Sequence, residues 1–200
     1  MSFLAHSLQL SAKGPVVLAS ASPRRAELLS KIGLSFNVIA SDVDEEFRNN
    51  ETPVAHVKRL ALAKASRVAA TITQGIIIGA DTIVVLDGNI LGKPQDVDEA
   101  RNMLSLLSGN THYVYTGFAI LEQQRRRSIV DFEKTSVHFR DLTNDEIDGY
   151  VQTGSPMDKA GAYGIQDISA IFVDRIDGCF YNVVGFPLAK FYLVMKQFLL

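Results

Sequence analysis

The sequence has one cysteine, Cys179, and no tryptophan among its 200 residues. A single cysteine excludes an internal disulfide framework and any cysteine-rich zinc site. No apolar run reaches the roughly 18 residues that a membrane-spanning helix requires, so no membrane partner is expected. A large excess of one charge is also missing, because 20 basic residues face 22 acidic ones and the net charge is −2. That near-balance argues against a dedicated nucleic-acid binder, although a pocket for a small anion needs only a few cations.

The composition is that of an ordinary soluble domain. Apolar residues make up 47% of the chain and charged residues 21%, which excludes a disordered, collagen-like or coiled-coil protein. A chain of this length buries roughly 70% of its unfolded surface, so it needs no disulfide or metal to fold. Residues 1–14 have no basic segment and only a broken apolar stretch, and we interpret them as an extension rather than a signal peptide. Residues 15–200 are expected to form a single domain in the cytoplasm.

Strand and helix signals alternate along the chain. The expected strands are residues 16–19, 36–40, 76–86, 112–121, 129–139, 171–176 and 179–184, the last two forming a hairpin. The expected helices run over residues 23–32, 53–70, 97–107 and 144–152 and from about 187 to the end. Asp96 is a typical N-cap, and Thr143 with Glu146 forms a capping box. This alternation predicts an α/β fold with a central mixed sheet and helices on its faces.

Ser20 to Arg25 lie between the first strand and the first helix, and they form a candidate phosphate site. Ser22 suits the N-cap and Pro23 the first helical position. Arg24 and Arg25 then lie where the helix dipole disfavours cations by up to about 1 kcal/mol each. A bound anion would reverse that effect, because backbone N–H groups, serine hydroxyls and two guanidinium groups form a cradle for phosphate. Alternatively, both arginines point into solvent or pair with acidic neighbours.

Asp81 follows the buried run 76–80 directly, and ligands of α/β proteins bind at strand ends. A carboxylate there, facing a wet cleft, could hold a divalent cation or deprotonate a water molecule. It could equally start an ordinary turn. The acidic run over residues 42–46 has two interpretations as well. It is either a solvated loop or part of a Mg²⁺ site, since Mg²⁺ typically takes one or two protein carboxylates plus substrate phosphates.

Lys64 lies on the apolar stripe of the helix that is expected to begin at Pro53, together with Leu60 and Val68. A lysine that faces the sheet is costly unless it meets an anion, although its side chain could instead reach solvent past the helix edge. If it meets a triphosphate, Lys64→Met should leave the stability of the free protein level or higher. Lys93 is a weaker candidate, because Gly-Lys-Pro is also an ordinary turn.

Seven segments, in this order and with fitting spacing, resemble the Maf family of septum-formation-inhibitor-like nucleotide pyrophosphatases. The resemblance covers about residues 15 to 200 and is carried by SASPRRAELL (20–29), SDVDE (41–45), LALAKA (60–65), GADT (79–82), GKP (92–94), DKAGAYGIQ (158–166) and VVGFPL (183–188). It implies cleavage of a nucleoside triphosphate between the α- and β-phosphates with a divalent metal. It also implies a fold similar to the inosine triphosphate pyrophosphatases, an elongated mixed sheet flanked by helices with a cleft between two lobes, and a homodimer.

The Pro-Arg-Arg, Gly-Ala-Asp-Thr and Ala-Tyr-Gly-Ile-Gln segments look like the branch that acts on dTTP and UTP. The 7-methyl-GTP branch carries a tryptophan after the proline and a glutamine after the aspartate, and it lacks Gly-Ile-Gln. The resemblance implies a role for each matching residue: Asp81 as proton acceptor, Arg24, Thr82 and Gln166 in base choice, Ser22, Arg25, Lys64 and Lys93 at the phosphates, and Glu45 with Asp81 at Mg²⁺ or Mn²⁺. A buried Gln166 amide would donate to a carbonyl of uracil or thymine and accept from the ring N–H. Cytosine cannot form this pair of hydrogen bonds.

Two alternatives stay open. The first is a regulator that binds nucleotide and arrests septation through protein contacts rather than turnover. The resemblance also implies a role in cell-division arrest for an enzyme of this family. The second is a 7-methyl-GTP-type specificity. Every charged position of the implied site is present, which favours the enzyme because a binding module would not need so complete a set. Pyrophosphate release from a panel of triphosphates would separate these hypotheses.

Overall fold

The computed structural model describes residues 14–199, so the predicted extension over residues 1–14 lies outside the described chain apart from Gly14. The described chain folds into two compact units. Unit 1 comprises residues 14–81, 116–133 and 185–199, and unit 2 comprises residues 82–115 and 134–184. No helix within the described residues is both long enough and apolar enough to cross a bilayer.

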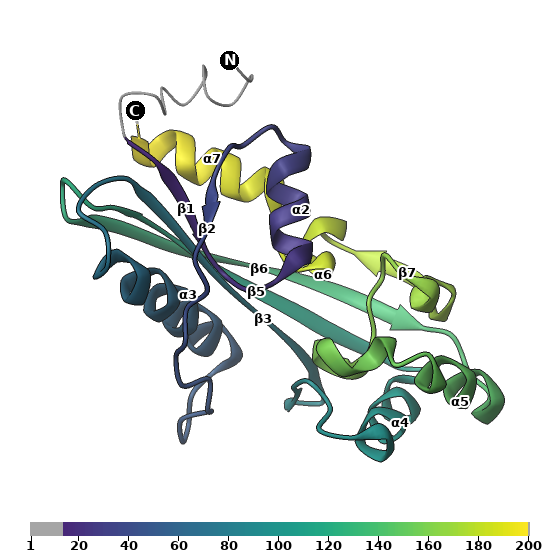
Figure 1. The fold of residues 1–200 in the computed structure, drawn as a ribbon. Helices are drawn as coiled ribbons and strands as arrows, with labels where there is room; N and C mark the ends of the chain where they lie inside the picture. The colour runs from purple at the N-terminus through teal and green to yellow at the C-terminus, as the bar shows by residue number, and fades with distance from the viewer. Residues whose placement is uncertain (1–13, 200) are drawn as a thin grey trace. The chain divides into compact units, whose positions relative to one another are not determined.

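The strands of residues 14–199 form the mixed sheet that the sequence predicts. Seven strands belong to it, in the order β2-β1-β3-β5-β6-β7 with β4 paired to β3. β1 pairs in parallel with β2 and β3, whereas β4 and β7 pair antiparallel with β3 and β6. The strand bounds are β1 Val16–Ala19, β2 Asn37–Val38, β3 Ile76–Leu86, β4 Asn89–Leu91, β5 Thr111–Glu122, β6 Arg127–Phe139 and β7 Val173–Asp177 (Figure 1).

Side-chain caps begin α3, α4 and α5, and the caps at Asp96 and Thr143 are those that the sequence predicts. Thr52 accepts a hydrogen bond from Ala55 N, Asp96 accepts one from Glu99 N, and Thr143 forms the predicted capping box with Glu146. These side chains satisfy backbone donors that the first helical turn leaves without partners. Within residues 14–199, the α-helices are α2 Pro23–Lys31, α3 Pro53–Ala69, α4 Val97–Leu107, α5 Asn144–Gln152, α6 Phe180–Val184 and α7 Leu188–Leu199, and the 3₁₀ turns are η2 Ser155–Asp158, η3 Ala160–Ala162 and η4 Ile168–Phe172.

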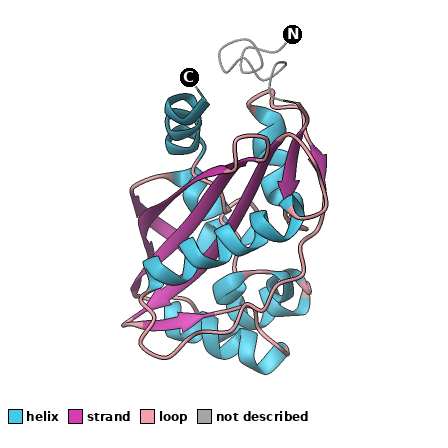
Figure 2. Cartoon of the chain, turned by 90° about the vertical axis from the view of Figure 1, so that its left-hand side faces the viewer, coloured by secondary structure: helices cyan, strands magenta, loops and turns pink. Residues whose placement is uncertain are grey.

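In unit 1, α3 lies across the strands, as Figure 2 shows from that side of the sheet. Its small residues pack on β1 and β3 in a core cluster that includes Ala61, Ala65 and Ile77. The approach is close because a Cβ on Gly79 would lie only 2.2 Å from the Ala61 carbonyl oxygen, and one on Gly117 in β5 would lie 2.3 Å from the carbonyl of the helix at Val57. Glycine at these points therefore sets the distance between the helix and the sheet.

In unit 2, an aromatic cluster forms the core. His112 is fully buried, and its Nε2 lies 2.8 Å from the Tyr163 hydroxyl. The rings of His112 and Tyr163 each meet Phe139 edge-on. Burial lowers the pKa of His112 from 6.5 to about 3, so this imidazole is neutral at physiological pH.

The hairpin predicted over residues 171–176 and 179–184 is wrong in its second half. β7 covers Val173–Asp177, but residues 180–184 form the helix α6. The backbone N–H and carbonyl of Cys179 both bond the Thr135 hydroxyl, and the buried Asn182 amide donates to that hydroxyl and to the Val114 carbonyl. These side-chain contacts replace the strand ladder that the apolar pattern suggested. The second predicted strand, residues 36–40, also shortens to Asn37–Val38.

Candidate functional site

Lys64 projects from α3 toward the sheet, as its place on the apolar stripe predicts. The residue is only 7% exposed. Its Nζ lies 2.7 Å from Asp81 Oδ1 and 2.6 Å from Glu45 Oε1. The alternative in which Lys64 reaches past the helix edge to solvent is therefore wrong. The anions it meets in this structure are two carboxylates of unit 1.

The sequence suggested that Asp81 lies at the end of a strand. In the structure it lies in the middle of β3. The expectation of a wet side chain is also wrong, because Asp81 is 5% exposed. Its Oδ1 accepts a hydrogen bond from Lys64 Nζ, which compensates the burial of the carboxylate. The contact with Lys64 engages Oδ1, so Oδ2 is the oxygen of this carboxylate that the Lys64 ammonium does not occupy.

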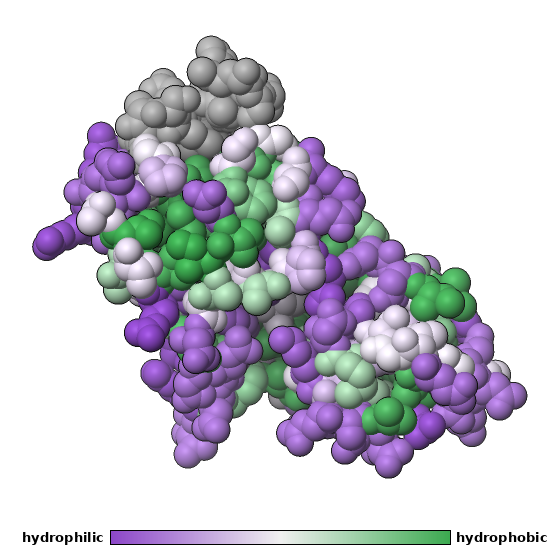
Figure 3. All heavy atoms as spheres, viewed as in Figure 1, coloured by the Kyte–Doolittle hydropathy of each residue, from purple (hydrophilic) through white to green (hydrophobic). Residues whose placement is uncertain are grey.

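Glu45 reaches the same ammonium from a different segment. It lies between β2 and α3, where residues 39–48 form no helix, strand or turn. The lower left of the space-filling view, where this segment and α3 lie in Figure 1, is mainly hydrophilic (Figure 3). The Glu45 side chain is 55% exposed. The structure thus joins a carboxylate from an irregular segment, Glu45, and a carboxylate from a strand, Asp81, at a single buried cation.

Arg25 lies at the third position of α2, beside this cluster. Its Nε donates to the Gly185 carbonyl at 3.1 Å, and its Nη1 donates to the Ser20 hydroxyl at 3.2 Å. Burial lowers the pKa of Arg25 from its ordinary value, while the charges of Asp81 and Glu45 oppose that shift. The guanidinium group is thus held by neutral oxygens and lies within the field of both carboxylates.

The other residues at this helix start have less direct roles. Ser22 occupies the N-cap position as predicted, but its side chain makes no capping hydrogen bond. Its backbone N–H instead donates to the buried Ser20 hydroxyl at 3.2 Å. Arg24 is half-buried at the second helical position. Ser20, which the sequence placed in the cradle without a separate role, thus links the backbone of the turn to Arg25.

Three further candidate residues belong to unit 2, whereas the cluster around Lys64 lies wholly within unit 1. Thr82 is half-buried in β3, next to Asp81 along the chain. Lys93 is exposed after β4, and Gln166 is exposed just before η4. The expected burial of the Gln166 amide is therefore not a property of the protein without ligand.

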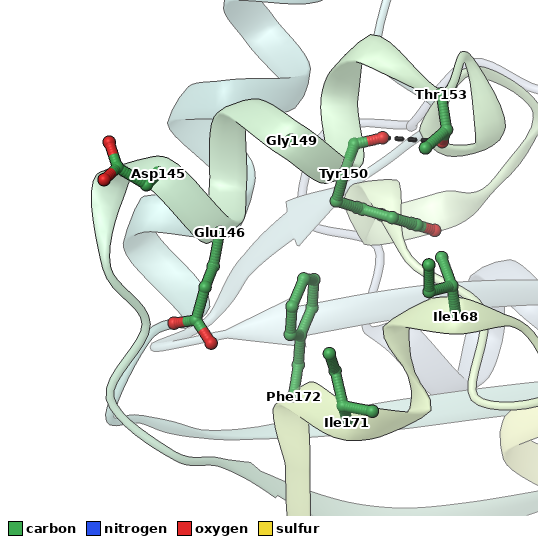
Figure 4. Close-up of a pocket in the computed structure, with 8 residues that line it drawn as sticks. All are labelled: Asp145, Glu146, Gly149, Tyr150, Thr153, Ile168, Ile171 and Phe172. Carbon is green, nitrogen blue, oxygen red and sulfur yellow. Dashed lines mark hydrogen bonds between the residues drawn. The ribbon is translucent and has the colours of Figure 1, made fainter.

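A separate pocket lies in unit 2 between α5 and η4 (Figure 4). Apolar side chains that include Ile168 and Phe172 line it, together with Asp145 and Glu146. Glu146 pairs with Arg140, whose hydrogen bonds lower the pKa of Glu146 to about 2. Among the residues that the structure describes, no lysine or arginine lines this pocket. Its acidic and apolar lining is unsuited to a triphosphate. The candidate phosphate-binding residues Ser22, Arg25 and Lys64 lie in unit 1, and Lys93 in unit 2 does not line this pocket.

Sequence reasoning missed one cluster near the site. Glu51 and Arg59 form a short ion pair of 2.6 Å, and His56 adjoins it at 2.9 Å from Glu51. Glu51 precedes α3 and Arg59 lies two helical turns into it. Their pairing depends on how the segment before the helix folds back onto it. The spacing rules that predict neighbours on a helix face apply only within the helix, so they cannot predict this pairing. A buried histidine in the first turn of α3 was the one available signal.

Known proteins resemble this chain over most of its length. The family described as Maf-like protein matches residues 15–198. A curated relative from Desulforamulus reducens, named dTTP/UTP pyrophosphatase, is 48% identical over 92% of this chain and 96% of its own length. A relative of the same name from Geotalea uraniireducens is 51% identical over 90% of this chain and 93% of its own. The Staphylococcus aureus Ham1 protein is similar in fold, with a TM-score of 0.53, 15% identity and coverage of 92% and 99%.

Proposed function

The chain belongs to the Maf family, and from that premise we propose that it hydrolyses dTTP and UTP to the monophosphate and pyrophosphate. Relatives that share about half of its residues over most of its length bear the name dTTP/UTP pyrophosphatase. The observation that carries the proposal is the contact of buried Lys64 with buried Asp81 at 2.7 Å, joined by Glu45. Cations and carboxylates in one buried cluster are the groups that phosphoryl chemistry requires.

Within unit 1, each side chain has a separate task in this proposal. Arg25 and Lys64 neutralise charge on the phosphates and on the departing pyrophosphate, because preformed donors stabilise charge that builds in the transition state. Asp81 orients a water molecule and takes its proton at Oδ2, the oxygen that Lys64 does not occupy. Burial of Asp81 strengthens both interactions, because electrostatic effects grow as water is excluded.

Glu45 and Asp81 are the residues that would hold a divalent metal, Mg²⁺ or Mn²⁺. They fit such an ion because their oxygens already converge on one cation, the Lys64 ammonium, and carboxylate oxygens are the ligands that Mg²⁺ prefers. Within residues 14–199, no group of three or more His, Cys, Asp or Glu side chains is assembled to hold a metal. The substrate phosphates would therefore complete the coordination. When bound, the metal supplies charge neutralisation at the triphosphate.

We assign the selection of the nucleotide base to Arg24, Thr82 and Gln166. Arg24 and Thr82 tune the choice of base, and Gln166 gives its amide N–H to a carbonyl of uracil or thymine while it accepts from the ring N–H. Lys93 contacts the phosphates, as does Ser22. The exposure of Gln166 and Lys93 supports this assignment, because side chains that must meet a ligand need to be accessible to it.

Family membership also supports a proposal for the compartment, the oligomeric state and the partners of the protein. We propose that the protein acts in the cytoplasm as a homodimer on small nucleotides, without a nucleic-acid or membrane partner. The near-balance of 20 basic and 22 acidic residues supports the last point. Any effect on septation would then depend on turnover of nucleotide.

The decisive experiment measures pyrophosphate release from dTTP, UTP, CTP, ATP, GTP and 7-methyl-GTP, with and without a chelator. We expect dTTP and UTP to be far ahead of the others and the chelator to abolish turnover. Asp81→Asn should lose activity, whereas Asp145→Asn, the same change at a unit 2 carboxylate, should keep it. Nucleotide binding without any pyrophosphate release would favour the regulator, and a preference for 7-methyl-GTP would refute the assigned branch.

A further inference from the structure

A buried carboxylate fastens the segment between β2 and α3 to the helix. The Glu51 side chain is 8% exposed. Its two oxygens accept hydrogen bonds from Arg59 Nε at 2.6 Å and from Arg59 Nη2 at 2.8 Å, and Oε2 lies 2.9 Å from His56 Nδ1. Two-point pairing of arginine with a carboxylate fixes orientation as well as distance. The hydrogen bonds from Arg59 are the main cause that lowers the pKa of Glu51 to about 2.

The same helix residues also hold the segment further upstream. Arg59 Nη2 donates to the Glu46 carbonyl at 3.0 Å. The Phe47 ring stacks on the His56 imidazole, with centroids 3.5 Å apart and planes 9° apart. We call Phe47, Glu51, His56 and Arg59 the α3 latch. It attaches an otherwise irregular segment to α3 at three successive places.

The contact of the latch that lies nearest to Glu45 is the hydrogen bond from Arg59 to the Glu46 carbonyl, one residue away. Because residues 39–48 form no helix, strand or turn, no backbone ladder fixes the direction in which Glu45 points. The carbonyl that Arg59 holds belongs to the next residue, Glu46, and neighbouring Cα atoms are only about 3.8 Å apart. The Glu45 side chain, 55% exposed, nevertheless reaches the buried Lys64 Nζ at 2.6 Å. The Glu46 N–H also donates to Asp44 Oδ1 at 2.9 Å, so Glu45 lies between this local turn and the carbonyl that Arg59 holds.

We propose that the α3 latch positions Glu45, and that Arg59 and Glu51 are positioning residues for the reaction. By holding the segment on α3, they present the Glu45 carboxylate at the Lys64–Asp81 pair, where the substrate phosphates and their cation bind. This inference rests on the proposed function for the role of Glu45. The α3 latch itself is a property of unit 1 that can be measured without turnover.

The first experiment measures hydrogen–deuterium exchange in the full chain. Arg59→Met deletes the two-point pairing and keeps much of the side-chain stem. Arg67→Met, the same change at an exposed position of α3, is the matched control. We expect amide exchange in residues 42–50 to rise at least tenfold in Arg59→Met, with β3 unchanged, and to stay at the wild-type rate in the control. Unchanged exchange in residues 42–50 would overturn the proposal, whatever the activity.

The second experiment is a double-mutant cycle on kcat/KM for UTP. Glu45→Gln should lower kcat/KM about tenfold in the wild-type background and less than twofold in Arg59→Met, because the carboxylate is already misplaced there. A latch that only stabilises the fold would give the same factor in both backgrounds, and that result would refute the positioning role. If Arg59→Met does not fold, Glu51→Gln replaces it in both experiments. Wild-type protein without UTP hydrolysis would contradict the proposed function, and the exchange measurement would then decide the latch alone.

Discussion

Replacement of Lys64 by methionine tests the buried ion pair. Lys64→Met keeps an unbranched stem and removes the ammonium group that lies 2.7 Å from Asp81 Oδ1. The two side chains are 9% and 7% exposed, so Asp81 would be left as a buried charge without its partner. Breaking a buried pair from one side costs about 3–5 kcal/mol. The Glu45 contact adds at most about 1 kcal/mol, since that side chain is largely exposed.

We therefore expect Lys64→Met to lower the free energy of unfolding by about 3–5 kcal/mol. This reverses the expectation from sequence, where Lys64 was thought to face only the substrate and its removal to leave stability level or higher. The sequence showed that the lysine points inward. It did not show that the lysine meets the buried carboxylate of Asp81.

The measurement is urea unfolding of Lys64→Met, Asp81→Asn and the double variant, followed by circular dichroism with unchanged slopes. In the double variant both charges are gone, so we expect the combined loss to fall short of the sum by about 2 kcal/mol or more. Glu45→Gln serves as the control and should cost less than about 1 kcal/mol. A loss below about 1 kcal/mol for Lys64→Met, with additive effects in the double variant, would refute the reasoning.

Three further outcomes are expected. Asp81→Asn should reduce turnover by on the order of 100-fold or more while the protein stays folded, because an amide oxygen can still accept from Lys64; near wild-type pyrophosphate release would contradict this. The wild type should prefer UTP over CTP by roughly tenfold to a hundredfold in kcat/KM, and Gln166→Ala should narrow that ratio; equal values for both in the unmutated protein would be incompatible with base reading by an amide. The pKa of buried His112 is lowered to about 3, so stability present above pH 6.5 is lost as the pH falls toward 3, by about 2–3 kcal/mol at pH 4.5. Urea unfolding at pH 7 and pH 4.5 should show this loss in the wild type and not in His112→Gln, and equal losses in both would count against it.

Local signals in the sequence predicted most elements. Strand β1, helix α4 and the capping box at Thr143 were all expected at the observed positions, because caps, glycines and apolar periodicity act over a few residues. The inward direction of Lys64 was predictable for the same reason, since a helical stripe fixes the face of each residue. Family resemblance then added residues such as Thr82 and Gln166, which no local pattern marks.

Interactions between distant segments could not be predicted. Residues 180–184 look like a strand by composition, yet Thr135 and Asn182 impose a helix through hydrogen bonds across more than 40 positions. The pairing of Glu51 with Arg59 likewise depends on a segment that folds back on α3. Burial of Asp81 in mid-strand was missed because an aspartate in an apolar run normally indicates its end.

The glycines under α3 have a consequence for how this protein tolerates change. At Gly79 and Gly117, α3 packs directly on the backbone of the strands, with no side chain between them that could adjust. One added methyl group at either glycine must therefore displace the helix as a whole. Lys64 moves with that helix and Asp81 does not. The separation of two charged atoms is therefore set by residues that carry no functional group at all. Gly→Ala is usually a mild substitution that restricts the unfolded chain. Gly79→Ala would instead change the distance between Lys64 and Asp81 without replacing any reactive side chain.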